Sequence, residues 1–194
     1  MPKRLIDILL SLAGLILFLP IGMCISVWIV VNSGWPIFFS QERIGKDSKP
    51  FKLYKFRSMK TNNSGALVTA KGDSRITSAG KFLRKYKLDE FPQLWNVLKG
   101  DMSIVGPRPE VQKYVNHYSL KEKDVLSVKP GITGVDSLQF SNEEELMAKA
   151  ENPEEFYINE LMPAKLKLSL EYIKNQNLKK DFGLIRDTVI KIWS

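Results

Sequence analysis

The chain has 194 residues but only one cysteine, Cys24, and one histidine, His117. A lone cysteine cannot form an intramolecular disulfide or a cysteine-based zinc site, and this composition fits a reducing compartment. A lone histidine excludes a multi-histidine metal site and argues against a Ser-His-Asp hydrolase. No internal repeat is visible, and the length suits one domain with a real core. The sequence therefore predicts a globular unit whose chemistry does not rest on cysteine or histidine clusters.

Charge is missing from a long N-terminal stretch. No charged residue lies between Ile8 and Gln41, and residues 5–31 are almost wholly apolar. A membrane-spanning helix needs about 20 apolar residues, whereas the apolar part of a signal peptide is shorter and precedes a small-residue cleavage site not evident here. Pro20 lies near the middle of the run and removes one backbone hydrogen bond, which favours a kink. We therefore expect a membrane anchor over residues 1–35 that is broken near Pro20.

Basic residues flank this anchor on both sides. Lys3 and Arg4 precede it, and Arg43 is the first of several that follow it. Positively charged flanks tend to remain on the cytoplasmic side of a membrane. A straight spanning helix satisfies only one flank, whereas a re-entrant helix, which enters and leaves by the same leaflet, satisfies both. A kinked helix that crosses the bilayer once is the alternative.

Positive charge is concentrated directly after the anchor. Residues 43–87 hold thirteen Lys and Arg against Asp47 and Asp73, a net charge of +11, while the whole chain carries +8. Anionic lipid headgroups, a phosphorylated substrate or nucleic acid would each explain this excess, and the neighbouring anchor favours the first two. No recognition helix, RNP-like aromatic motif or zinc finger is visible, so we expect no nucleic-acid partner. A solvated basic face is the alternative for most individual lysines.

Residues 88–109, LDEFPQLWNVLKGDMSIVGPRP, carry the most informative chemistry. Helical spacing of apolar residues, a proline in the first turn and Gly100 as a stop predict a helix of about ten residues that begins near Glu90. Asp89 and Glu90 would lie at its N-terminus, where unpaired N–H groups and the helix dipole favour carboxylates, or a metal ion with phosphate. Arg108 stands between two prolines, so its backbone has little freedom to lose when the guanidinium clamps an anion.

Each of these residues also has a purely structural interpretation. Asp89 is a good helix cap, worth about 1 kcal/mol. Arg108 fits a turn with a solvated side chain. Their clustering in one short stretch, next to a basic segment and a membrane anchor, favours a site for phosphate chemistry.

The remaining segments predict a mainly α fold with a little β. Residues 51–57 interleave basic and aromatic side chains and predict a strand, and residues 102–105 predict a short one. Residues 62–73 predict a loop that closes over a substrate, and residues 130–134 predict a tight turn. Residues 181–193 predict a basic amphipathic helix that lies on a membrane surface or packs in the core.

Short motifs in a fixed order resemble those of the monotopic phosphoglycosyl transferases, the bacterial sugar transferase family, in the short form with one catalytic domain. The motifs are KRLID at 3–7, QERIG at 41–45, YKFRSM at 54–59, DSRIT at 73–77, LDEFPQLWN at 88–96, KGDMS at 99–103, GPRPE at 106–110 and KPGITG at 129–134. Any one would be weak, but the ordered series covers almost the whole chain. The resemblance implies a re-entrant anchor in the cytoplasmic leaflet of the bacterial inner membrane and a catalytic domain over residues 36–194 at its cytosolic face.

The resemblance also implies a reaction. A sugar-1-phosphate is transferred from a UDP-sugar to polyprenyl (undecaprenyl) phosphate, and UMP is released, as the first membrane step of glycoconjugate synthesis. Asp89 is implied to be the nucleophile that carries the phospho-sugar and to help bind the cofactor Mg²⁺, and Glu90 to be an acid/base or metal partner. The residues implied to bind substrate phosphates are Lys55, Arg57, Arg84 and Arg108.

Two places depart from the common pattern of that family. Val135-Asp136 follows the KPGITG motif where many members have a tryptophan, and residues 169–172 replace a frequent Asp-x-Tyr-Tyr. The sugar and the glycan are therefore not predicted, and homo-oligomers remain compatible with the sequence. The alternative functions are a catalytically silent basic membrane adaptor and, as a third choice, a nucleic-acid-binding membrane protein.

Overall fold

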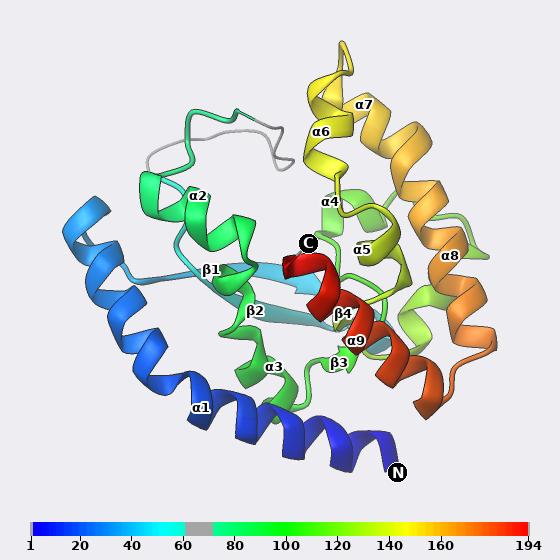
Figure 1. Cartoon of the computed structure of the whole chain (residues 1–194). Coiled ribbons are helices and arrows are strands. Elements are labelled where there is room, and N and C mark those ends of the chain that lie inside the picture. The colour runs from blue at the N-terminus through cyan, green and yellow to red at the C-terminus, as the bar shows by residue number, and fades with distance from the viewer. Residues whose placement is uncertain (1, 61–71, 194) are drawn as a thin grey trace.

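The computed structural model describes residues 2–60 and 72–193, and helices dominate these ranges (Figure 1). The α-helices are α1 (Pro2–Ser33), α2 (Ser78–Lys85), α3 (Gln93–Lys99), α4 (Gln112–Val115), α5 (Val135–Gln139), α6 (Glu143–Ala148), α7 (Pro153–Phe156), α8 (Met162–Lys174) and α9 (Leu178–Trp193). The strands are β1 (Phe38–Ile44), β2 (Pro50–Phe56), β3 (Ser103–Val105) and β4 (Gly131–Thr133). The predicted fold class, mainly α with a little β, is confirmed. The predicted loop over residues 62–73 lies, except for its last two residues, outside the described residues.

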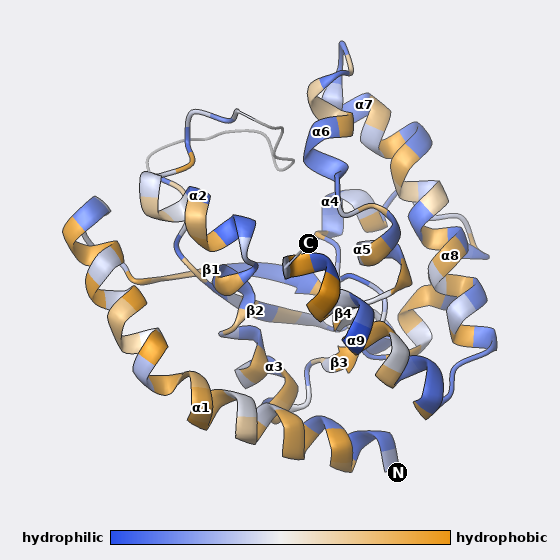
Figure 2. Ribbon diagram, viewed as in Figure 1, coloured by the Kyte–Doolittle hydropathy of each residue, from blue (hydrophilic) through white to orange (hydrophobic). Residues whose placement is uncertain are grey.

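α1 is a long apolar helix. Its most apolar stretch of 18 residues has a mean hydropathy of 2.6 and is only 17% buried, so the helix is long and apolar enough to cross a membrane. Helical structure continues through Pro20. Figure 1 shows the helix axis turning partway along its length, and Figure 2 shows apolar residues along the whole helix. The predicted break near Pro20 takes the form of a bend within one continuous helix.

One side of α1 packs against the rest of the protein. Phe18, Ile25 and Ile29 are buried in a cluster with residues of β2 and α2. The ring of Phe18 also stacks on the ring of Phe91, with centroids 3.7 Å apart. Burying one such side chain stabilises a fold by about 1.5–3 kcal/mol. α1 and the remainder of the chain therefore share a core.

Polar contacts fasten the N-terminal end of α1. The ammonium of Lys3 lies 2.5 Å from a carboxylate oxygen of Asp181 in α9. Asp7 is buried, and its Oδ1 accepts the backbone N–H of Ile104 in β3 at 3.0 Å. Such hydrogen bonds offset the cost of burying a carboxylate. The start of α1 is thus fixed to both β3 and the C-terminal helix.

β1 and β2 form an antiparallel hairpin in which Phe38 lies opposite Phe56 and Ile44 opposite Pro50. The strand predicted over residues 51–57 is confirmed to within one residue. β1 was not predicted, because its sequence FFSQERI is mostly polar after the first two residues. β1 is a strand because it pairs with β2, and its own composition does not favour one.

Asn96 of α3 fastens that helix to the free edge of β2. Its side-chain oxygen accepts the N–H of Tyr54 at 3.1 Å, and its side-chain nitrogen donates to the carbonyl oxygen of Lys52 at 2.7 Å. Asn96 is fully buried, so these bonds satisfy polar atoms that water does not reach. The contact fixes Lys55, the next residue of β2, relative to the segment that leads into α3.

β3 and β4 are parallel and lie next to residues 106–109, which we call the GPRP turn. The tight turn predicted over residues 130–134 is wrong, because residues 131–133 form β4. Gly106 and Gly131 permit this pairing. A Cβ added at Gly106 would lie 2.5 Å from the carbonyl oxygen of Lys129, and one at Gly131 would lie 2.1 Å from the backbone nitrogen of Gly106. The N–H of Gly131 donates to the carbonyl oxygen of Pro107 at 2.8 Å. The two motifs therefore form one backbone-to-backbone unit.

Candidate active site

Asp89 and Glu90 lie in a 3₁₀ turn, Leu88–Glu90, and α3 begins only at Gln93. The predicted helix start near Glu90 is therefore wrong. Lys87, whose φ of 55° and ψ of 19° lie in the left-handed region, turns the chain after α2, and the acidic pair falls in a separate 3₁₀ turn before α3. A non-glycine residue in this conformation costs about 1 kcal/mol or more and is commonly found at functional sites. The turn directs both carboxylates into the protein.

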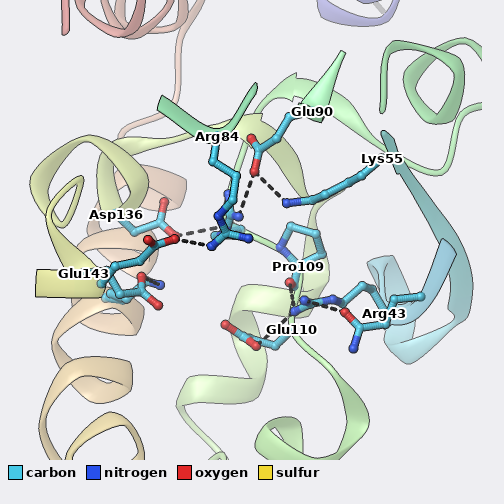
Figure 3. Close-up of polar contacts among 12 residues, drawn as sticks. Arg43, Lys55, Arg84, Glu90, Pro109, Glu110, Asp136 and Glu143 are labelled. Atoms are coloured by element: carbon cyan, nitrogen blue, oxygen red, sulfur yellow. Dashed lines mark hydrogen bonds and ion pairs between the residues drawn. The ribbon is translucent and has the colours of Figure 1, made fainter. Parts of the chain in front are cut away.

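Glu90 is held by two cations from different parts of the chain. Its Oε1 lies 2.7 Å from the Lys55 ammonium of β2 and 2.9 Å from Nη2 of Arg108 in the GPRP turn. Figure 3 shows Lys55 and Glu90 pointing toward one another. Glu90 is buried, so the attraction acts in a medium that screens charge weakly. The structure thus brings three of the predicted site residues together.

The charges of Glu90, Lys55 and Arg108 shift one another's pKa values. Burial alone would raise the pKa of Glu90, but the positive charges of Lys55 and Arg108 outweigh it and hold that pKa well below its usual range. Burial lowers the pKa of Lys55, against the opposing effect of Glu90. Glu90 in turn raises the pKa of Arg108. The two ion pairs hold Lys55 and Arg108 beside Glu90, and its expected role as an acid/base or metal partner stays a prediction.

Asp89 has a different environment from its neighbour. It is 4% exposed, and within the described residues its Oδ1 is buried without any hydrogen-bond partner. Burial raises the pKa of Asp89, and the charge of Lys55 opposes that rise. Unpartnered buried oxygens are rare in folded proteins because they lose hydration without compensation. Oδ1 of Asp89 is therefore an oxygen that a cation or an electrophile would satisfy.

Arg84 of α2 lies on another side of the same group. Its positive charge acts on Asp89 and opposes the rise in the pKa of that carboxyl. The guanidinium forms an ion pair with Glu144 of α6, and its Nη1 lies 3.8 Å from the sulfur of Met59. In Figure 3 Arg84 enters the space between Glu90 and the acidic residues of the α5–α6 segment. The guanidinium of Arg84 is near the site, but it is already paired with the carboxylate of Glu144.

Arg57 does not join this group. It is buried, and its guanidinium donates to the carbonyl oxygen of Ser33 at 2.8 Å and to that of Trp35 at 2.6 Å. The expected phosphate-binding role of Arg57 is therefore not supported, because carbonyls at the end of α1 use its hydrogen-bond donors. Such carbonyls need external donors, and a cation there also complements the helix dipole. Arg57 fixes the C-terminal end of α1, as Lys3 fixes the other end.

Asp136 is a residue of this region to which the sequence assigned no role. It lies in the first turn of α5 and is buried, and its Oδ2 accepts the backbone N–H of Arg108 at 3.1 Å. The signal that could have found it is its position two residues after the KPGITG motif. Parallel pairing of that motif with β3 brings it against the GPRP turn.

Among the described residues, protein side chains alone do not form a magnesium site. Within residues 2–60 and 72–193, no group of three or more His, Cys, Asp or Glu side chains could hold a metal ion. Mg²⁺ is commonly held by one or two carboxylates together with substrate phosphates and water. The unpartnered Oδ1 of Asp89 fits that pattern as a single protein ligand.

The chain matches the family of bacterial sugar transferases along residues 1–194 and belongs to it. A Bacillus subtilis protein, named provisionally as an undecaprenyl-phosphate N-acetylgalactosaminyl 1-phosphate transferase, is 51% identical over 56% of this chain and 62% of its own length. The UDP-glucose:undecaprenyl-phosphate glucose-1-phosphate transferase of Escherichia coli is 38% identical over 97% of this chain and 39% of its own length. An Aeromonas hydrophila UDP-N-acetylgalactosamine-undecaprenyl-phosphate N-acetylgalactosaminephosphotransferase is 42% identical over 68% of this chain and 32% of its own length. The chain thus spans about a third to two thirds of these relatives.

Proposed function

We propose that this chain transfers a sugar-1-phosphate from a UDP-sugar to undecaprenyl phosphate and releases UMP, as the first membrane step of glycoconjugate synthesis. The observation that carries the proposal is the buried pair of carboxylates, in which Asp89 is unpartnered while Glu90 holds Lys55 and Arg108. The names of the relatives, which include both substrates, support it.

The reaction proceeds in two displacements at one phosphorus atom. A carboxylate oxygen of Asp89 attacks the β-phosphorus of the UDP-sugar, and the bond from that phosphorus to the bridging oxygen breaks, so that UMP leaves with the electron pair. Asp89 then carries the sugar phosphate as an acyl phosphate. A phosphate oxygen of undecaprenyl phosphate attacks the same phosphorus, which frees the Asp89 carboxylate and forms undecaprenyl diphosphate sugar.

The cations around Asp89 bind the phosphate oxygens. Arg108 offers a planar guanidinium, Lys55 a point charge, and both stay in place because Glu90 holds them. Arg84 becomes a third donor once it is released from Glu144. When bound, Mg²⁺ neutralises diphosphate charge so that a carboxylate can approach, and Oδ1 of Asp89 is the oxygen available to hold it.

The anchor is proposed to be re-entrant in the cytoplasmic leaflet of the bacterial inner membrane. Lys3 at one end of α1 and Ser33 at the other contact the same folded body, through Asp181 and Arg57. A straight helix of 32 residues would be about 48 Å long, more than the roughly 30 Å of a bilayer's hydrocarbon core. A helix crossing once would place its two ends on opposite sides, which these shared contacts oppose. The lipid acceptor and the soluble donor can then meet at one surface.

Release of UMP tests the proposed function. Purified full-length protein in detergent or lipid is given Mg²⁺, undecaprenyl phosphate and a panel of UDP-sugars. We expect UMP release with at least one sugar and its loss in Asp89→Asn, while Asp124→Asn, which changes an exposed carboxylate, keeps full activity. Full activity of Asp89→Asn would contradict the nucleophile. Absence of UMP release with every sugar would favour the adaptor, and salt-sensitive binding to DNA or RNA in that case would favour a nucleic-acid partner.

A further inference from the structure

Asp136 is a buried carboxylate for which the proposed reaction provides no role. It is 3% exposed, and its Oδ2 accepts the backbone N–H of Arg108 at 3.1 Å. Its Oδ1 is buried and has no hydrogen-bond partner in the part of the chain that the structure describes. Placing a charge in the interior is costly, and the backbone contacts of Asp136 with Arg108 and Ser137, together with the nearby charge of Lys165, offset only part of that cost. A role in holding Arg108 explains the contact that it makes.

The residues beside Arg108 make its hydrogen bond to Asp136 important for the backbone conformation. Pro107 and Pro109 have no backbone N–H, so the Arg108 N–H is the one main-chain donor of this tripeptide. The carboxylate is also tightly confined, since a Cβ added at Gly134 would lie 2.6 Å from Oδ1 of Asp136. This confined carboxylate, which accepts the Arg108 N–H at 3.1 Å, fixes the backbone from which the guanidinium projects toward Glu90.

A cavity next to this contact is too small for a sugar. It has a volume of about 30 Å³ and is lined by residues that include Arg108, Asp136, Lys165 and Ser169. Such a volume accommodates about two water molecules and no hexose ring. The contact of Asp136 with Arg108 therefore suggests its role better than the cavity does.

We infer that Asp136 is the positioning residue of the Arg108 phosphate clamp: by holding the Arg108 backbone it aims the guanidinium at Glu90 and at the substrate diphosphate. The inference rests on the proposed function and assigns Asp136 no contact with substrate. Arg108 is the group that binds phosphate, and Asp136 acts through it.

A double-mutant cycle tests this coupling, with kcat and KM for UMP release from the full-length protein as readout. Asp136→Ala is expected to lower kcat/KM roughly ten- to a hundredfold, the range for a lost hydrogen bond to a charged group. Asp136→Asn keeps an acceptor oxygen and the shape and is expected to recover most of the loss. In an Arg108→Ala background, Asp136→Ala should cost less than about threefold more. Ser137→Ala, in the same helix, is the matched control and should behave as the unsubstituted protein.

A second readout keeps the inference separate from the proposed function. The affinity of each variant for UDP, measured by calorimetry, does not require turnover and should show the same non-additive pattern. Additive losses, or unchanged kcat/KM and UDP affinity in Asp136→Ala, would overturn the inference even when UMP is released. A non-additive pattern in UDP affinity without UMP release from any UDP-sugar would support the inference and overturn the proposed function. Failure of the unsubstituted protein to bind UDP would overturn both.

Discussion

At the scale of residues, burial acts in opposite ways on two neighbouring carboxylates. Oδ1 of Asp89 has no partner among the described residues, and burial raises the pKa of Asp89. Burial also opposes ionisation of Glu90, but two cations share its Oε1 and hold its pKa down. Carboxylates whose pKa values are pushed apart commonly divide the roles in catalysis. In the proposed reaction, this division assigns bond formation to Asp89 and the holding of Lys55 and Arg108 to Glu90.

Asp89→Asn should stabilise the fold while it abolishes transfer. The pKa of Asp89 is raised in the folded state, so the folded state binds more protons than the unfolded chain and loses stability as pH rises through that pKa. The amide avoids this loss, and we expect a gain of about 1 kcal/mol at neutral pH, or ~2–4 °C in Tm. Thermal unfolding at neutral pH and near pH 4 measures it, since the gain should vanish in acid. A lower Tm for the variant at neutral pH would contradict this reading of the site.

Glu90→Gln should destabilise the fold. Lys55 and Arg108 would keep their charges in a partly buried place without a counter-ion, at a cost of about 2 kcal/mol, which is reduced from the fully buried case by their partial exposure. The pKa of Glu90 is lowered in the folded state, so its contribution is present above the unfolded pKa and is lost as pH falls through the folded one. Denaturant unfolding should therefore show a difference between the two proteins at neutral pH that shrinks in acid. A constant difference across that range would point to packing instead of charge.

At the scale of elements, the sequence predicted what is local and missed what depends on distant contacts. α9 and β2 follow from periodicity within their own residues, and the clustering of Asp89, Glu90 and Arg108 follows from their short separation. β4 needed the close approach of Gly106, which no local pattern reveals. The separate 3₁₀ turn that holds the acidic pair follows the left-handed Lys87, a conformation that the sequence pattern does not reveal. Arg57 carries the same charge as the other site cations, and only the folded structure shows that it serves the end of α1.

α6 contributes an acidic side chain to the rim of the site, and this contact gives a prediction for the donor. Glu144 forms an ion pair with Arg84. Glu144→Gln should therefore free the Arg84 guanidinium to bind the diphosphate. We expect KM for the UDP-sugar to fall about two- to fivefold, the range for a partly exposed ion pair. Glu151→Gln removes the same charge from an exposed position and is the control. Steady-state kinetics at low and high salt measures both. An unchanged or higher KM in Glu144→Gln would show that the pair does not compete with substrate.

At the scale of the whole molecule, the two ends of α1 are tied to one body. Lys3 contacts Asp181 of α9, and Arg57 holds the carbonyls of Ser33 and Trp35, so both ends of α1 contact the same folded body. Figure 2 shows the apolar character of α1 and of parts of α9. Phe182, Val189 and Trp193 of α9 are exposed, which suits contact with lipid at the surface.

This arrangement predicts the accessibility of the N-terminus in cells. A cysteine-bearing tag before residue 2 should be labelled by a membrane-impermeant thiol reagent only after the inner membrane is opened, as should a tag after the C-terminal residue. The Cys24→Ser background removes the single native thiol. A tag at the N-terminus labelled in intact spheroplasts would contradict the re-entrant anchor and support a helix that crosses once.

The covalent phospho-sugar on Asp89 is the central step of the proposed reaction, and the mass of the intact protein tests it. Protein mixed with Mg²⁺ and its UDP-sugar, without undecaprenyl phosphate, and quenched rapidly should gain the mass of one sugar phosphate as one UMP is released. Peptide mapping should place that mass on Asp89, and addition of undecaprenyl phosphate before the quench should remove it. Transfer that proceeds at full rate with no adduct, or with an adduct on another residue, would contradict the role of Asp89.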